Sequence, residues 1–180
     1  MRTIIRHLPF GEQRSQVVVR GRSIPILPFQ AVVWVGVVSV GRIPHDPQAP
    51  RIPAVLDLGF NGTFAIREEQ LREWTGMDPR LFPKLRRARL RGAPTDVRLA
   101  NLWLHPNVPY TRDLSEGLPL RMELSKGILV MIPPGTAGET DHRPRLPVLG
   151  VQALHRAKLR LFVNCGSCHL SIRTSSWSWF

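Results

Sequence analysis

Seventeen prolines and fourteen glycines are spread along the whole of this 180-residue chain, and they are not collected in one tract. Both residue types interrupt regular secondary structure, so they divide the sequence into short segments. Short segments separated by turn residues are typical of all-β domains. The chain is therefore predicted to be mainly β, with one or two short helices and no long helix.

The segments between the turns are often rich in Val and Ile, whose branched β-carbons favour a pleated strand over a helix. The clearest predicted strands are residues 16–20 and 31–40. Further strands are predicted at residues 54–56, 63–66, 97–104, 118–124, 127–132, 159–163 and 169–174. Residues 118–132 are expected to form a hairpin, and a two-residue turn at Gly166-Ser167 is expected before the last strand.

Two short helices are predicted between these strands. Residues 67–74 lose β-branched side chains and place Leu71 and Trp74 on one helical face, and residues 151–157 suit one or two turns. The segments at 41–53 and 136–145, the first rich in proline and the second polar, are expected to be loops.

Length and composition fit one ordinary globular domain, since 43% of the residues are hydrophobic and 21% are charged. We expect an N-terminal extension with strands at 1–30, the main domain at 31–174 and a C-terminal tail at 175–180 that packs through its aromatic residues. The longest apolar stretch, residues 31–40, is about half the length of a membrane-spanning helix. The first residues contain no apolar export signal, so a cytoplasmic location without membrane insertion is expected.

The chain carries 25 Lys and Arg against 13 Asp and Glu, a formal net charge of +12. Six basic residues lie within residues 80–91. Such a bias attracts polyanions, including nucleic acid. Because no aromatic stacking platform accompanies this run, it is interpreted as a solvated surface, and nucleic acid stays open as a partner.

The most informative segment is residues 54–66, AVLDLGFNGTFAI. Asp57 ends an apolar strand, and Gly59 and Gly62 allow the backbone to turn tightly. A carboxylate beside an apolar core needs hydrogen bonds or a charged partner. The simplest interpretation is an Asp that caps its own turn, and the alternative is a functional carboxylate.

This segment resembles the active-site motif of the retropepsin-like family of aspartic proteases, in which an apolar pair precedes D-[TS]-G and often N-G. The matching residues are Leu56, Asp57, Gly59, Phe60, Asn61 and Gly62. A second signature of the family, an apolar pair and a Gly before a short helix, is similar to Val148, Leu149 and Gly150, about 90 residues downstream. The resemblance spans roughly residues 31–174 and implies a closed retropepsin-like acid-protease barrel.

The resemblance also implies a mechanism. Two subunits would form a homodimer and contribute one Asp57 each to a catalytic pair that hydrolyses peptide bonds, with residues 58–62 as the active-site loop and no metal or cofactor. A glycine-rich hairpin covers the substrate in this family, and residues 91–95 are the nearest match. Leu58 departs from the family, which has Thr or Ser there. The alternative is therefore an inactive protein of the same fold that binds peptide or an acidic partner such as nucleic acid.

Cys165, Cys168 and His169 form the sequence C-x-x-C-H, which is also the attachment motif of c-type haem. Haem would require export, and zinc would require further ligands, for example His142. Two thiols at a turn in a reducing cytoplasm are the simplest interpretation. Asp141 beside His142 is interpreted as part of a loop.

Overall fold

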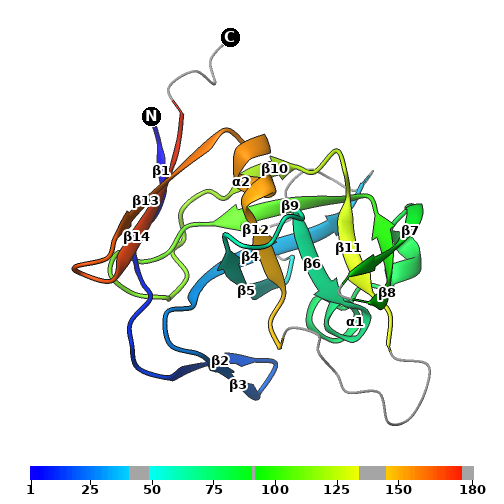
Figure 1. Cartoon of the computed structure of the whole chain (residues 1–180), viewed down its shortest axis with the longest axis horizontal. Helices are drawn as coiled ribbons and strands as arrows, with labels where there is room; N and C mark the ends of the chain where they lie inside the picture. Colours follow the sequence, from blue (N-terminus) through cyan, green and yellow to red (C-terminus); the bar gives the residue numbers. More distant parts are fainter. Residues whose placement is uncertain (41–48, 91, 134–144, 176–180) are drawn as a thin grey trace.

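The computed structural model describes residues 1–40, 49–90, 92–133 and 145–175 (Figure 1). These residues form a mainly β structure with short helices, which confirms the predicted class. Its largest element is a nine-stranded sheet with the order β10-β9-β4-β5-β12-β6-β11-β8-β7. The nine strands are β4 (Ala31–Ser39), β5 (Arg51–Asp57), β6 (Phe64–Arg67), β7 (Lys84–Leu90), β8 (Ala93–Arg98), β9 (Ala100–His105), β10 (Leu120–Glu123), β11 (Ile128–Met131) and β12 (Val148–Gly150).

The expected closed barrel is not formed by the part of the chain that the structure describes. The large sheet ends in β10 on one side and in β7 on the other, and neither pairs with a further strand. The outer strand β7 carries exposed Lys84, Arg86, Arg87 and Arg89. Charged side chains on an edge strand disfavour further strand pairing, which explains why the sheet stays open there.

The five remaining strands form two smaller sheets. Strands β1 (Thr3–Pro9), β14 (His169–Thr174) and β13 (Leu159–Asn164) form an antiparallel sheet, seen on the left of Figure 1. Strands β2 (Ser15–Val19) and β3 (Arg22–Ile26) form a hairpin, and its turn places Arg20 and Gly21 at positive φ. Two positive φ values are what a two-residue type I′ turn requires.

The two helices lie where the sequence predicts them. Helix α1 (Glu68–Thr75) buries Leu71 and Trp74 and ends at Gly76, which has φ of 70°. Helix α2 (Val151–Arg156) follows β12 directly, and a short 3-10 turn η1 (Pro79–Leu81) precedes β7. Among the residues that the structure describes, no helix is long and apolar enough to cross a membrane.

Two of the predicted strand boundaries were wrong. Residues 97–104 do not form one strand, because the chain breaks between β8 and β9 at Leu99, whose N–H donates to the carbonyl of Pro83 over 2.8 Å. Residues 51–53, expected in a loop, belong to β5. Pro53 is tolerated there because β12 pairs with β5 only from Val55 to Asp57, so no strand on that side requires the missing N–H.

Residues 118–132 do not form the expected hairpin. Strand β10 pairs with β9, whereas β11 pairs with β6 and β8. Gly127 separates the two strands with φ of 72° and lies so close to β8 that an added Cβ would meet the carbonyl of Arg98. The turn before the last strand is also longer than expected, because Asn164 pairs with His169 and leaves four residues, 165–168, between the strands.

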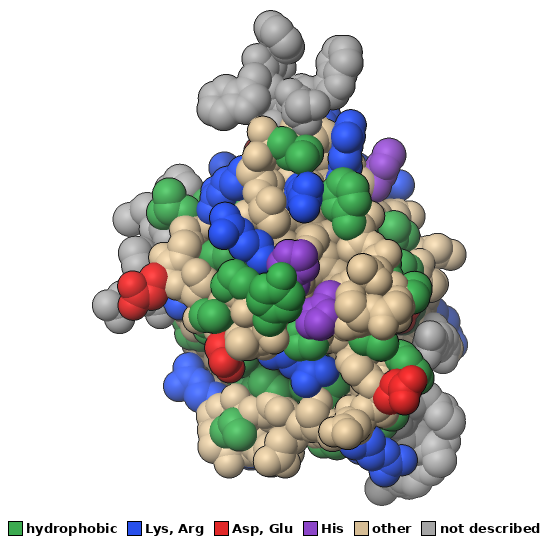
Figure 2. Space-filling model, turned by 90° about the vertical axis from the view of Figure 1, so that its left-hand side faces the viewer, with side chains coloured by type: hydrophobic (Ala, Val, Ile, Leu, Met, Phe, Trp, Pro, Cys, Tyr) green, Lys and Arg blue, Asp and Glu red, His purple; other side chains and the backbone are tan. Residues whose placement is uncertain are grey.

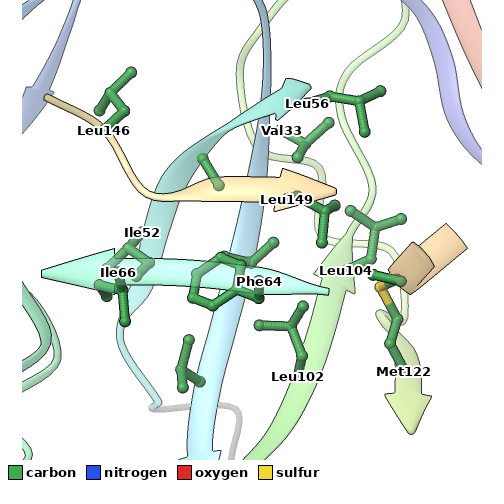
Figure 3. Packing of buried hydrophobic residues seen from close by; sticks show 14 of the residues in the cluster. Val33, Ile52, Leu56, Phe64, Ile66, Leu102, Leu104, Met122, Leu146 and Leu149 are labelled. Carbon is green, nitrogen blue, oxygen red and sulfur yellow. The ribbon is translucent and has the colours of Figure 1, made fainter. Parts of the chain in front are cut away.

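The core is built where the central strands cross (Figure 3). Side chains from β4, β5, β6, β9, β10 and β12 contribute to one buried cluster that includes Val33, Ile52, Leu56, Phe64, Ile66, Leu102, Leu104, Met122 and Leu149. Burying such side chains is worth about 1.5–3 kcal/mol each, so this crossing fixes the positions of the strands that surround Asp57.

A buried carboxylate holds the outer strand β7 to the sheet. Asp96 in β8 is 5% exposed and accepts a bond from Lys84 Nζ at 2.6 Å and one from Arg98 at 2.8 Å. Burial alone would raise the pKa of Asp96, but the two cationic partners together lower it. The ionised form is therefore the one that the folded state favours.

We predict that Asp96→Asn lowers the free energy of unfolding by about 3 kcal/mol at pH 7, because it leaves two cations without their shared partner. A carboxyl group with a lowered pKa stabilises the fold fully above the unfolded-state pKa, about 3.9, and loses that effect as the pH falls through the folded-state value. Urea unfolding from pH 7 down to pH 3 should therefore show the two proteins converging. Asp113→Asn, at an exposed Asp, is the control, and an equal loss there would contradict this account.

Candidate active site around Asp57

Asp57 ends β5, and its side chain is half-buried at the start of the turn that leads to β6. Its Oδ1 accepts a hydrogen bond from the Gly59 N–H at 2.8 Å, and its carbonyl accepts one from the Phe60 N–H at 3.3 Å. Asp57 thus caps its own turn, as the simplest interpretation predicts. The second carboxylate oxygen accepts no hydrogen bond from the described part of the chain, so it remains able to bind water or a ligand.

Strand β12 brings the second sequence signature next to Asp57. It lies between β5 and β6, parallel to the first and antiparallel to the second. The register pairs Leu149 with Leu56 and Gly150 with Asp57. Two motifs about 90 residues apart in the sequence therefore meet in adjacent strands.

Gly150 is the point of closest approach between β12 and the Asp57 turn. Its N–H donates to the carbonyl of Thr63 over 2.9 Å. A Cβ added at Gly150 would meet the carbonyl oxygens of Gly62 and Phe60 and would lie 2.7 Å from the Phe60 ring. Only glycine fits this position, and α2 begins immediately after it.

Thr63 fixes the far end of the turn, a role that no local sequence pattern indicated. Its side chain is buried, and its hydroxyl donates to the carbonyl of Gly127 over 2.6 Å. Gly127 precedes β11, the strand that runs parallel to β6. Residues 57–63 are therefore held at one end by β12 and at the other by the start of β11.

A small apolar cluster beside Asp57 joins the turn to the outer hairpin. Its members are buried Ala65, Met131 and Val148 and the partly buried Phe60, Leu90 and Leu129. Phe60 comes from the Asp57 turn, and Leu90 comes from the end of β7. We call this group the Phe60 cluster. It gives the turn a buried apolar neighbour.

The hairpin of β7 and β8 is the segment that the sequence suggested as a substrate cover. Gly92 has φ of 84° at its tip, Ala93 to Thr95 already belong to β8, and Arg91 lies outside the described residues. Leu90, at the end of β7, packs against the same buried residues as Phe60 does. Leu90 was not recognised from the sequence, because its partners are far away along the chain.

Leu58 lies at the exposed side of the turn, with 52% of its surface accessible. Asn61 is exposed as well, whereas Phe60 and Gly62 are partly covered. A leucine in this position offers no hydroxyl for a hydrogen bond and presents apolar surface to water. The turn thus combines one accessible carboxylate oxygen with an apolar side chain that is not packed within the chain.

The cysteine motif is not part of this site. Cys165 and Cys168 are free thiols in the turn between β13 and β14, and the Cys168 N–H donates to the carbonyl of Cys165 over 3.3 Å. Across the described ranges, no three or more His, Cys, Asp and Glu side chains are grouped to hold a metal ion. Asp141 and His142 lie outside those ranges.

No model of a protein family matches the chain, and no curated protein matches it either. The resemblance to retropepsin-like proteases therefore rests on the two sequence motifs alone.

We predict that Gly150→Ala destabilises the protein by at least about 1–3 kcal/mol, the usual cost of an added methyl group in a packed site. The reason is that its Cβ has no space between Phe60 and Gly62. Thermal and urea unfolding would measure the loss. Gly11→Ala is the matched control, since a Cβ there meets nothing within 4 Å. Equal stability of the two variants would show that the turn does not rest on β12.

Proposed function

We propose that this chain is a retropepsin-like aspartic endopeptidase that acts as a homodimer in the cytoplasm and hydrolyses peptide bonds. The observation that carries the proposal is the register of β5 and β12, which pairs Asp57 with Gly150. Both residues belong to the two family-like motifs, and the motifs occur in the order and separation that the family shows. The exposed Leu58 and the partly buried Phe60 would supply apolar surface for a peptide beside the carboxylate.

The chemistry requires two copies of Asp57, one from each subunit, on either side of a water molecule. The pair holds one proton, because two like charges at contact distance resist joint ionisation, as is general for aspartic proteases. The ionised carboxylate removes a proton from the water as it attacks the carbonyl carbon, and the protonated one donates to the carbonyl oxygen. Proton transfer to the amide nitrogen then releases the two peptide products.

Leu58 is the residue expected to affect the rate of this reaction most, because it lacks the hydroxyl of the family's Thr or Ser. In the family, the hydroxyl at this position bonds across the two-fold axis and holds the two turns in register. Leu58 is exposed in the single chain, so two copies could instead pack against each other in the dimer. Apolar packing is less directional than a hydrogen bond, and a slower enzyme is the expected consequence.

A second candidate function follows from the same residue. Without the hydroxyl, the protein could be inactive and bind a peptide beside the Phe60 cluster. Asp57 would then only cap its own turn, through the hydrogen bond that it accepts from the Gly59 N–H. A pepstatin-type inhibitor separates the two functions. A working Asp57 pair should bind it at mildly acidic pH, and Asp57→Asn should abolish that binding.

We predict that the purified protein cleaves a randomised peptide library between about pH 4 and pH 7, where a pair that shares one proton is active. Asp57→Asn should reduce cleavage to background, because neither asparagine can act as the base. Asp113→Asn, at an exposed Asp away from the turn, should cleave normally. Absence of cleavage by a folded dimer, or equal cleavage by the Asp57→Asn protein, would refute the protease proposal.

We also predict that Leu58→Thr raises kcat by up to about tenfold, since one well-placed hydrogen bond is worth at most about 1.4 kcal/mol. KM should change little, because the threonine orients the turns and does not contact the peptide. Steady-state kinetics on one cleaved peptide would measure both. Leu58→Val, which removes bulk without adding a hydroxyl, is the control, and an equal gain there would exclude a hydrogen-bond effect.

A further inference from the structure

Basic residues are concentrated at the end of the molecule where β1 pairs with β14. Neither residues 1–11 nor residues 151–175 contain a single Asp or Glu. The same two segments contain Arg2, Arg6, Arg156, Lys158, Arg160 and Arg173, and none of these pairs with a carboxylate in the described part of the chain. This excess of unpaired cations should attract polyanions strongly.

Aromatic rings lie at the same end, next to the sheet of β1, β14 and β13. The rings of His7 and Tyr110 are stacked with their centres 4.5 Å apart and an angle of 2° between their planes. His169 meets both rings edge-on, at 6.5 Å from His7 and 5.6 Å from Tyr110. Tyr110 is 62% exposed, so this preformed stack is accessible from solvent.

A second aromatic group lies on the same face of that sheet. Arg173 covers the ring of Phe162 at 4.9 Å, and Phe162 is 44% exposed. The register pairs Phe162 with Ser171 and Asn164 with His169, so Phe162 and His169 point to the same side. The His7 N–H donates to Ser171 Oγ over 3.0 Å, which ties the ring stack to this face.

Figure 2 views this side of the molecule. His and hydrophobic side chains lie next to one another near the middle of the face, with Lys and Arg side chains above them. Arg160 pairs with Arg173 across β13 and β14 and therefore lies on the same side as Phe162. We call the group of His7, Tyr110, Phe162, Arg160 and Arg173 the terminal-sheet face.

Backbone strain is concentrated around the terminal-sheet face. Six non-glycine residues of the described chain have positive φ, and four of them are His7, Tyr110, Lys158 and Cys168. Positive φ is unfavourable for these residue types, and such outliers cluster at functional sites. Two of these residues, His7 and Tyr110, form the stacked pair of rings.

We propose that the terminal-sheet face binds single-stranded nucleic acid, a function separate from the Asp57 site. Unpaired bases would stack on the exposed side of the His7–Tyr110 pair and on Phe162, while Arg160 and Arg173 neutralise phosphates between them. Exposed rings spaced along a basic sheet are the arrangement that binds single strands without sequence readout. A duplex would not supply these contacts, because its bases are stacked on each other.

The proposal is tested by the anisotropy of a fluorescent 12-nucleotide oligothymidylate at about 100 mM salt. The wild-type protein should bind, and Tyr110→Ala should weaken binding at least about fivefold through lost stacking. Tyr110→Phe should bind like wild type because it keeps the ring. Asp57→Asn should also bind like wild type, so failure of the protease proposal would leave this result unchanged.

A pair of double variants separates this face from net charge alone. Arg160→Gln with Arg173→Gln should weaken binding about tenfold or more and flatten the salt dependence. Arg87→Gln with Arg89→Gln removes the same charge from β7 and should change binding only slightly. Equal losses in the two double variants, no effect of Tyr110→Ala, or no binding by the wild type would overturn the proposal. Preference for anionic lipid vesicles over the oligonucleotide, through the same residues, would replace nucleic acid with a membrane surface.

Discussion

The structure around Asp57 depends on one close contact, the approach of β12 to the Asp57 turn at Gly150. Any side chain there would collide with Phe60 and Gly62. Strand β12 has only three residues and lies between β5 and β6, so this contact sets its register, in which Gly150 pairs with Asp57. The core beneath, with Leu149 beside Leu56 and Phe64, gives the short strand its stability. Backbone geometry and burial together therefore expose one carboxylate at a fixed position.

Local sequence predicted the parts of the fold that local forces determine. Val-rich β4 and the helix with Leu71 and Trp74 were correct to within one residue at each end, because side-chain shape and periodicity decide them. The break at Leu99 and the separation of β10 from β11 depend on contacts with Pro83 and Arg98, which no local pattern shows. The same limit applies to the site: the turn at Asp57 was visible in sequence, whereas Thr63 and Leu90 gain their roles only from distant partners.

The positions of the basic residues also differ in importance between the sequence and the folded structure. The basic run at 80–91 is the most visible charge feature of the sequence. Its Lys84, however, forms an ion pair with Asp96, which also pairs with Arg98. The cations that form no ion pair in the described chain and that lie beside aromatic rings are at the other end, where β1 meets β14. His7, Tyr110 and His169 are far apart along the chain, so their stack could not be predicted from sequence. A peptide site at Asp57 and a polyanion site at the terminal-sheet face would use different surfaces of one small fold.

The central claim is that two chains share one pair of Asp57 carboxylates, and mixing active and inactive chains tests it most directly. Wild-type protein is equilibrated with increasing amounts of the Asp57→Asn variant at constant total concentration, and peptide cleavage is measured. If both subunits must supply Asp57, activity falls as the square of the wild-type fraction, to about one quarter in an equal mixture of freely exchanging dimers. A fall in direct proportion to the wild-type fraction would show that each chain acts alone, and it would contradict the shared pair.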